Sequence, residues 1–184
     1  MSRILIINGS PRKDGVDSNI AKAISERLSS KGQTVEIVDV YDLRISGCRA
    51  CMSCKKTGKC AIDDDMMPVY DKIKSSDMLI FLSPIYFGSE TGQLKLLIDR
   101  LFATTGAERP LGSVKMSSVL LTCGDPMGNM TYGSNLMKFS NAMKYLKVED
   151  FASGCILGGL KPEDVATSSK VDDYIESLEF QLGI

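Results

Sequence analysis

Residues 3–19 read RILIINGSPRKDGVDSN, and this stretch decides the fold. Its apolar run from Ile4 to Ile7 has the length of a strand that is buried on both faces. Gly9 and Gly15 then allow a tight turn, and the polar residues that follow suit the start of a helix. A strand, a glycine-bearing turn and a helix in that order predict the first unit of an α/β protein with a parallel sheet.

The same alternation of buried strand and amphipathic helix continues along the chain. We expect strands at residues 3–8, 34–39, 78–83, 114–123 and 148–157. We expect helices at residues 18–30, 65–75, 92–102, 134–146 and 170–181. Neither a linker nor an internal repeat divides the chain, so residues 1–184 are predicted to form a single doubly wound domain.

The first turn separates the doubly wound folds that this pattern allows. A dinucleotide-binding fold needs G-x-G-x-x-G in the turn, and the residues after Gly9 do not provide it. A Walker A loop is also excluded, because Gly15 is followed by Val16 and not by Lys-Ser or Lys-Thr. We therefore expect the flavodoxin-like arrangement, a five-stranded parallel sheet with the strand order 2-1-3-4-5.

Composition excludes several classes of function. The net charge is -1 and acids and bases are interspersed, so we expect neither nucleic acid nor a membrane as a partner. The N-terminal apolar run is too short for a signal peptide or a membrane span, which predicts a cytoplasmic protein. The chain has no histidine, so the usual Ser-His-Asp and Cys-His catalysis is absent. The chemistry must come from a cofactor, thiolates or carboxylates.

The first turn also carries groups that suit an anion. Ser10, Ser18 and Asn19 place donors at the mouth of the first helix, whose free N–H groups attract negative charge. Arg12 adds a guanidinium that grips phosphate oxygens in bidentate fashion. The turn therefore predicts a monophosphate site. The alternative is ordinary turn chemistry, with Asp17 or Ser18 as the helix cap.

A second turn follows the third strand, where residues 83–92 read SPIYFGSETG. In the 2-1-3-4-5 order, ligands sit between the carboxyl ends of strands 1 and 3, so the two turns are expected to be neighbours. Apolar and aromatic side chains at such an edge suit the face of a planar ring: Pro84, Ile85, Tyr86 and Phe87. The alternative is that they pack beneath the following helix.

These two motifs, together with TGQLK at residues 91–95 and IDR at residues 98–100, resemble the NADPH-dependent FMN reductase group of flavodoxin-like proteins. The resemblance covers residues 1–157. It implies an FMN-dependent oxidoreductase whose chemistry is centred on the flavin, with NAD(P)H as an electron donor. It also implies the site residues: Ser10, Arg12, Ser18 and Asn19 for the phosphate, and Pro84, Ile85, Tyr86, Phe87 and Gly88 for the isoalloxazine. Gly124, after the fourth strand, is expected to border the flavin edge.

One departure from that group concerns the residues just before the first helix. Its members often carry Gly-Asn-Thr there, whereas this chain has Gly15, Val16, Asp17 and Ser18. A carboxylate repels a phosphate. Asp17 is therefore expected to turn away from the phosphate as a helix cap.

Residues 47–60 form a cysteine-rich loop with the spacing C-x2-C-x2-C-x5-C, made by Cys48, Cys51, Cys54 and Cys60. Three closely spaced thiolates with a fourth nearby favour an iron-sulfur cluster. Structural zinc usually uses two Cys-x-x-Cys pairs that are well separated. Free or redox-active thiols are the other alternative, because the lysines in this loop would lower their pKa values.

With the FMN motifs, this loop resembles the iron-sulfur flavoprotein family, in which a [4Fe-4S] cluster exchanges electrons with FMN. The resemblance implies that the four cysteines are the cluster ligands. It also implies a homo-oligomer, a dimer or a dimer of dimers, in which the cluster of one protomer approaches the FMN of another. A redox partner such as ferredoxin or NAD(P)H is expected. The alternatives are a cluster-free NAD(P)H-dependent reductase of FMN, quinones or nitro compounds, and a pure flavodoxin-type electron carrier.

Two further sets of residues are expected to play no part in the chemistry. Cys123 and Cys155 fall at or within predicted strands, where a free cysteine is usually a small buried hydrophobe. The acidic run at residues 63–65 is interpreted as the solvated start of the second predicted helix.

Overall fold

The computed structural model describes residues 1–106, 110–126 and 129–184, and its centre is a parallel sheet. The sheet has the order β2-β1-β3-β4-β5, and β6 also pairs with β4. The strands are β1 (Arg3–Asn8), β2 (Thr34–Asp39), β3 (Met78–Pro84), β4 (Met116–Cys123), β5 (Glu149–Asp150) and β6 (Gly154–Leu157). This order confirms the flavodoxin-like α/β fold.

The expectation of one continuous strand at residues 148–157 is wrong. β5 and β6 both pair with β4, and three residues that belong to neither strand separate them. Ala152 has a left-handed φ of 53°. The Oγ atom of Ser153 accepts a hydrogen bond from Val119 N at 3.0 Å. A side chain thus serves the neighbouring strand where the ladder is interrupted, and hydrophobic patterning does not encode such an exchange.

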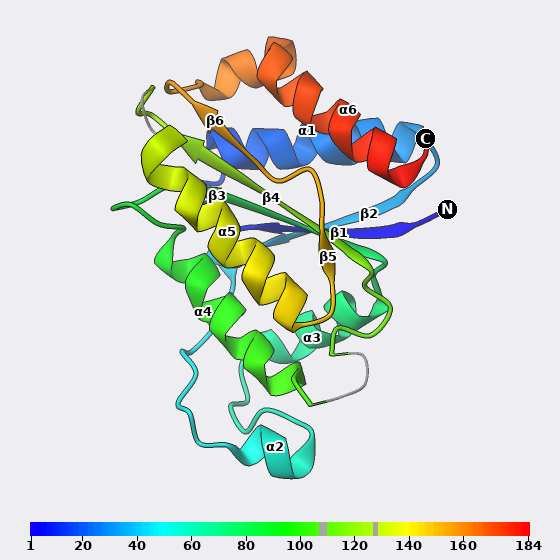
Figure 1. Ribbon diagram of the computed structural model, residues 1–184, viewed down its shortest axis with the longest axis vertical. Coiled ribbons are helices and arrows are strands. Elements are labelled where there is room, and N and C mark those ends of the chain that lie inside the picture. The colour runs from blue at the N-terminus through cyan, green and yellow to red at the C-terminus, as the bar shows by residue number, and fades with distance from the viewer. Residues whose placement is uncertain (107–109, 127–128) are drawn as a thin grey trace.

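Helices cover both faces of the sheet. α1 (Val16–Ser30) and α6 (Ser169–Leu182) lie on one face, and α3 (Met66–Ser75), α4 (Gly92–Arg100) and α5 (Asn129–Tyr145) lie on the other (Figure 1). Ile4 and Ile6 of β1 belong to the core beneath α1 and α6, whereas Leu5 and Ile7 belong to the opposite core. Burial on both faces explains why these strands read as continuous apolar runs. No helix in the described ranges combines the length and the apolar character that crossing a bilayer requires.

Several helix boundaries differ from the expected ones. α1 begins at Val16, two residues early, and α5 begins at Asn129, five residues before the expected start. α4 ends at Arg100, and the chain continues as a 3-10 helix, η2 (Leu101–Thr104). A further 3-10 helix, η3 (Pro162–Thr167), precedes α6.

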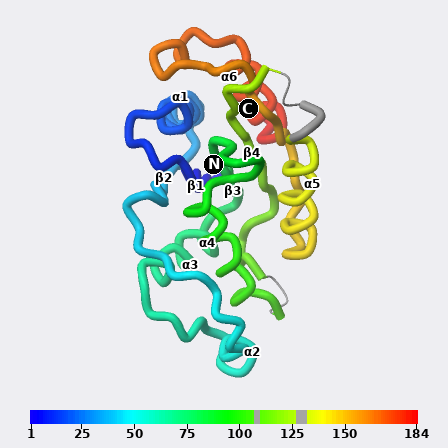
Figure 2. The backbone as a smooth tube through the Cα atoms, turned by 90° about the vertical axis from the view of Figure 1, so that its left-hand side faces the viewer, coloured from blue at the N-terminus to red at the C-terminus, as the bar shows by residue number. Residues whose placement is uncertain are grey.

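A long excursion of the chain follows β2 and contains all four clustered cysteines. It begins with the 3-10 helix η1 (Val40–Asp42) and carries a short helix, α2 (Ser53–Thr57), that the sequence did not indicate. α2 lies at the end of the molecule away from α1 and α6 (Figures 1 and 2). The cysteine-rich loop therefore projects beyond the helical layer of α3 and α4.

A buried ion pair joins the two ends of this excursion. Arg100, which is only 1% exposed, bonds both carboxylate oxygens of Asp64 at 2.7 and 3.1 Å. It also donates to the carbonyl oxygens of Ser46 and Ile62 at 2.9 and 3.2 Å. The interpretation of residues 63–65 as a solvated helix start is therefore wrong for Asp64. Burial acts to raise the pKa of Asp64, but hydrogen bonds from Arg100 and two backbone N–H groups hold it below the usual value.

Candidate functional site

The turn after β1 and the turn after β3 meet at the carboxyl edge of the sheet. The fully buried Thr91 side chain donates to Gly9 O at 2.7 Å, and Gly9 N donates to Leu82 O at 2.7 Å. A Cβ atom at residue 9 would lie 2.8 Å from Leu94 Cβ, closer than real contacts allow. Only glycine at this position lets α4 approach the first turn, and the two turns converge as the strand order predicted.

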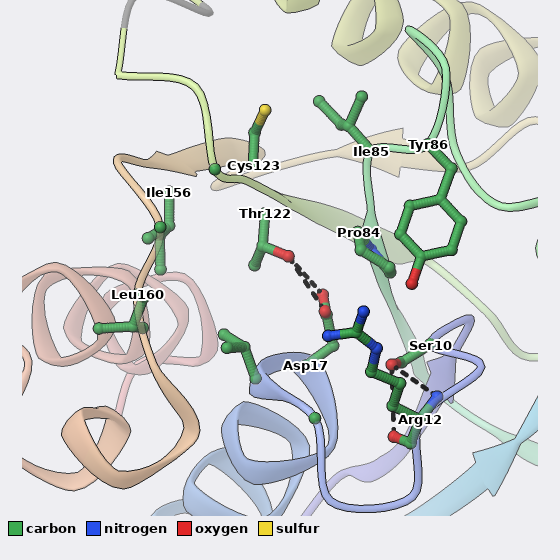
Figure 3. Close-up of a pocket in the computed structure, with 14 residues that line it drawn as sticks. Ser10, Arg12, Asp17, Pro84, Ile85, Tyr86, Thr122, Cys123, Ile156 and Leu160 are labelled. Carbon is green, nitrogen blue, oxygen red and sulfur yellow. Dashed lines mark hydrogen bonds between the residues drawn. The ribbon is translucent and has the colours of Figure 1, made fainter.

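A cavity opens where these turns meet (Figure 3). Its volume is about 210 Å³, less than the ~300–1,000 Å³ typical of sites that enclose a drug-sized ligand. Many of the residues expected to form the site line it: Ser10, Arg12, Pro84, Ile85, Tyr86 and Gly124. The polar loop thus forms one side of the cavity and the apolar turn after β3 another.

Ser18 and Asn19 lie behind the loop and do not line the cavity. Ser18 Oγ donates to Arg12 O at 2.8 Å and accepts from Asn8 Nδ2 at 2.9 Å. Asn19 Nδ2 donates to Gly15 O at 2.9 Å. Both side chains hold the loop in shape, and direct contact of either with a phosphate stays a prediction.

Phe87 and Gly88 form the tip of a tight hairpin and also do not line the cavity. Tyr86 and Ser89 pair on either side of them, with Tyr86 N donating to Ser89 O at 2.8 Å. Phe87 and Gly88 both have positive φ, 52° and 87°, as a two-residue hairpin turn requires. The buried Asn135 of α5 anchors the turn by donating to Gly88 O at 2.8 Å. The side chain of Phe87 is fully exposed in the single chain.

The expectation that Asp17 caps the helix and turns away from the phosphate loop is wrong. Gly15 is the N-cap of α1 and no side chain caps the helix, so Asp17 is not a cap turned away from the loop. It lines the cavity beside Arg12 and is 2% exposed (Figure 3). Its two carboxylate oxygens lie 3.0 and 3.2 Å from Thr122 Oγ1. Burial raises the pKa of Asp17 from 3.8 to about 6, although the Thr122 hydrogen bond acts to lower it.

The far wall of the cavity was also missed by sequence reasoning. It comes from the ends of β4 and β6 and from the segment after β6: Thr122, Cys123, Ile156, Gly159 and Leu160. Because residues 148–157 were expected to be one plain strand, nothing drew attention to its carboxyl end. The available signal was the pair Gly158 and Gly159, whose φ values of 92° and 70° mark a turn at the edge where ligands bind.

The four cysteines of the excursion surround one small hollow. Cys48, Cys51, Cys54 and Cys60 all line it, with Arg100 among the other lining residues. Ala50 and Met52, on either side of Cys51, have left-handed backbone conformations with φ of 50° and 59°. Within the described part of the chain, no three Cys, His, Asp or Glu side chains lie close enough together to hold a metal ion. The thiols are gathered around one space without ligating geometry.

The hollow has a positive character. Arg100 lines it, and the Nε–H group of this residue is buried without a hydrogen-bond partner. A buried donor that lacks an acceptor is costly, and an anionic group in the hollow would satisfy it. The surrounding loop adds Arg49, Lys55, Lys56 and Lys59, with no acidic residue between Cys48 and Ile62. This donor set and charge fit a thiolate-ligated cluster, whose net charge is negative.

The profile of the NADPH-dependent FMN reductase family matches residues 2–153. The chain belongs to this family. FMN, after which this family is named, has a phosphate and a planar flavin ring, and the cavity has a polar loop on one side and an apolar turn on another. A Cβ atom at Gly15 would lie 3.0 Å from Arg12 Cβ and 3.2 Å from Ser10 Oγ, so the loop folds tightly at the N-terminus of α1. Pro84, Ile85 and Tyr86 supply an apolar wall beside it.

Two curated proteins show what the chain is similar to. An iron-sulfur flavoprotein of Methanocaldococcus jannaschii is 35% identical over 98 residues, 53% of this chain and 51% of that protein. The chain thus spans about half the length of the curated iron-sulfur flavoproteins it matches. An FMN-dependent NADH:quinone oxidoreductase of Mesoplasma florum is 23% identical over 181 residues, 92% of this chain and 90% of that protein.

A solved structure supports the fold independently. An NAD(P)H:quinone oxidoreductase from Methanothermobacter marburgensis superimposes with a TM-score of 0.71 at 18% sequence identity. The superposition covers 95% of this chain and 91% of that one. At this level of identity, the likeness establishes the flavodoxin-like architecture and nothing finer.

Proposed function

We propose that this protein is an FMN-dependent oxidoreductase that exchanges electrons between FMN and a [4Fe-4S] cluster. The observation that carries the proposal is the Thr91 to Gly9 hydrogen bond, which joins the two turns around one cavity. The joined turns combine a cationic, glycine-bearing loop at a helix N-terminus with an apolar wall. That pairing suits a ligand with an anionic end and a planar apolar end.

The roles of the residues follow from where they lie. Ser10 and Arg12 would hold the phosphate, with Ser18 and Asn19 fixing the loop that presents them. Pro84, Ile85 and Tyr86 would position the ring, and Gly124 leaves its edge clear of a side chain. When bound, FMN supplies redox chemistry that the side chains of this protein cannot, since FMN takes up two electrons together and releases them singly. The protein supplies binding, orientation and exclusion of water.

Replacing Arg12 with Ala is expected to weaken FMN binding by about 1.5–3 kcal/mol, roughly 10- to 100-fold in Kd. The reason is the loss of a charge-assisted hydrogen bond to the phosphate. Titration of FMN with protein, followed by quenching of flavin fluorescence, measures the effect. Lys13→Ala is the matched control, because Lys13 is exposed, pairs with Asp42 at 3.6 Å and does not line the cavity. Equal Kd values for the two variants would remove Arg12 from the site.

The proposed cluster ligands are Cys48, Cys51, Cys54 and Cys60. Their shared hollow, the unpaired Arg100 Nε–H group and the absence of acidic residues from the loop support this assignment. Positive charge and N–H donors around thiolate sulfur stabilise the reduced, more negative state of a cluster and raise its potential.

A homo-oligomer is part of the proposal. The residues that line the flavin cavity and those that line the cysteine hollow form two separate sets, with none in common. We propose that the hollow of one protomer approaches the cavity of another, which would bring the two cofactors together for electron exchange. The exposed Phe87 beside the cavity is an aromatic side chain of the kind that interfaces bury. The external redox partner would be ferredoxin or NAD(P)H.

The second candidate function is a cluster-free, NAD(P)H-dependent reductase of FMN, quinones or nitro compounds. It is favoured by the Mesoplasma florum relative, which matches nearly the whole chain. Tyr86, which lines the cavity and is 44% exposed, would offer a nicotinamide or quinone ring a stacking surface at the open mouth.

Anaerobic mixing of the FMN-loaded protein with NADPH or NADH distinguishes these functions. A reductase is expected to lose its flavin absorption band rapidly. A protein that also holds a cluster is expected to lose a broad visible shoulder as well. Reduction by ferredoxin or dithionite alone would contradict direct NAD(P)H use. Without a cluster shoulder that result would leave the pure electron carrier, and with one it would leave ferredoxin as the redox partner. Failure to bind FMN at all would overturn the proposed function.

A further inference from the structure

A buried carboxylate stands inside the proposed phosphate site. Asp17 is 2% exposed and lines the same cavity as Ser10 and Arg12. It follows Gly15 by two residues, in the first turn of α1, so its carboxylate occupies the end of the helix to which an anion is drawn. An acid at this position is at odds with binding a second anion there.

The surroundings of Asp17 do little to balance its charge. Its carboxylate is stabilised by Thr122, whose hydroxyl group donates only one proton to the two oxygens, and by a backbone hydrogen bond of Asp17 itself. The other titratable side chains that line the cavity are Arg12 on the loop, Tyr86 after β3 and Cys123 at the end of β4. In the described ranges Arg12 forms no ion pair with Asp17, and β6 and the segment before η3 contribute only apolar residues and glycine.

A phosphate monoester carries a charge of about -1.5 to -2 at neutral pH. In a buried site this charge and an ionised Asp17 repel each other strongly. Protonation of Asp17 removes this repulsion. The neutral carboxyl group has an O–H group that can donate a hydrogen bond to a phosphate oxygen.

We propose that Asp17 takes up a proton from solvent when the phosphate of FMN binds, and that its carboxyl group then donates a hydrogen bond to a phosphate oxygen. This inference rests on the proposed function. Asp17 is then a residue that makes retention of the cofactor depend on pH near neutrality. Burial already raises the pKa of Asp17 to about 6 in the free protein. Protonating this carboxylate near neutral pH therefore costs less free energy than protonating an exposed one.

The test compares the wild type with Asp17→Asn, whose amide donates a hydrogen bond without a proton. The Kd for FMN is measured by fluorescence quenching between pH 5.5 and 8.5. FMN itself titrates near pH 6, and this contribution is common to both proteins. Above pH 6, the Kd of the wild type for FMN is expected to rise by up to about tenfold per pH unit more than the Kd of the variant does. At pH 8, Asp17→Asn is expected to bind FMN at least about tenfold more tightly than the wild type.

Calorimetry at pH 7.5 in buffers with different ionisation enthalpies counts the protons directly. The wild type is expected to take up about one more proton per FMN than Asp17→Asn does. Riboflavin, which lacks the phosphate, is expected to cause no such uptake. Thermal melting followed by circular dichroism checks folding, and the variant should be at least as stable at pH 8 because it lacks the buried charge.

Three outcomes overturn the inference. Parallel pH profiles with equal proton uptake would mean that Asp17 keeps its charge. Equal weakening of FMN and riboflavin binding in Asp17→Asn would assign the carboxylate to a sugar-chain hydroxyl group. If Asp17→Asn bound FMN no more tightly than the wild type at pH 8, an ionised Asp17 would not oppose phosphate binding. Absence of FMN binding by the wild type at every pH would instead refute the proposed function itself.

Discussion

Asp64→Ala is expected to lower the free energy of unfolding by about 3–5 kcal/mol. Asp64 accepts two hydrogen bonds from Arg100, which is 1% exposed. Removing the carboxylate leaves a buried guanidinium without a counter-charge, and such a charge is much more costly than the original pair. Asp64 also accepts from Ser46 N at 2.9 Å and from Met66 N at 3.1 Å, so the start of α3 loses a partner too. Urea denaturation followed by circular dichroism measures the change.

Asp99→Ala is the matched control for this substitution. Asp99 is also an acidic residue paired with a base, Lys95, but the pair lies on the surface of α4 with both side chains about half exposed. Exposed pairs of this kind contribute about 0.3–0.5 kcal/mol. A loss in Asp64→Ala as small as that in Asp99→Ala would show that the buried pair does not stabilise the fold.

The same substitution tests whether the buried pair closes the cysteine-rich excursion. Arg100 bonds residues on both sides of it, at Ser46 and at Ile62 and Asp64. Loss of the carboxylate is expected to speed proteolytic cleavage within residues 47–60 more than cleavage elsewhere. Uniform acceleration along the chain would indicate global destabilisation alone.

Replacing any one of the four loop cysteines with Ser is expected to abolish iron binding, from about four irons per chain to nearly none. All four thiols line one hollow, so the loss of one leaves an incomplete set: Cys48, Cys51, Cys54 or Cys60. The measurement is an iron and acid-labile sulfide assay on anaerobically prepared protein, with its absorption spectrum. FMN binding should be preserved, because none of the four lines the flavin cavity.

Cys155→Ser is the matched control for the cysteine substitutions. Cys155 lies in β6, and burial raises the pKa of its thiol to about 11, so it has little thiolate character. Its replacement is expected to leave the iron content unchanged. An iron-free wild type after careful reconstitution would contradict the cluster. One zinc per chain, or disulfides within the loop, would then identify the metal or redox alternative.

The central strands β1 and β3 were predictable because they are buried on both faces. In such strands nearly every side chain faces a core, so an uninterrupted apolar run marks the strand directly. β1 has the expected bounds, and β3 extends one residue further. The edge strand β2 also has the expected bounds, although most of its side chains are exposed or half-buried. The two turns that follow β1 and β3 were also predictable as neighbours, since strand order alone brings the carboxyl ends of those strands together.

The roles of single polar residues were not predictable in the same way. Asp17 and Asp64 were expected to be a helix cap and a solvated residue, and Ser153 lay within an expected strand, but all three have buried or half-buried partners. The partners lie 105, 36 and 34 positions away along the chain, respectively. Local patterning reports which face of a segment is apolar, not which distant group a polar side chain meets.

The amino-acid sequence by itself determined the α/β class, the strand order, the family and the grouping of four thiols, because each depends on spacing within a segment or on short motifs. Tertiary structure alone decided that Asp17 faces the cavity, that Arg100 and Asp64 close the cysteine-rich excursion, and that the last strand is broken. Each of these depends on burial of a polar group against a distant partner. Burial is a property of the folded chain, and it sets both the energy and the pKa of such groups.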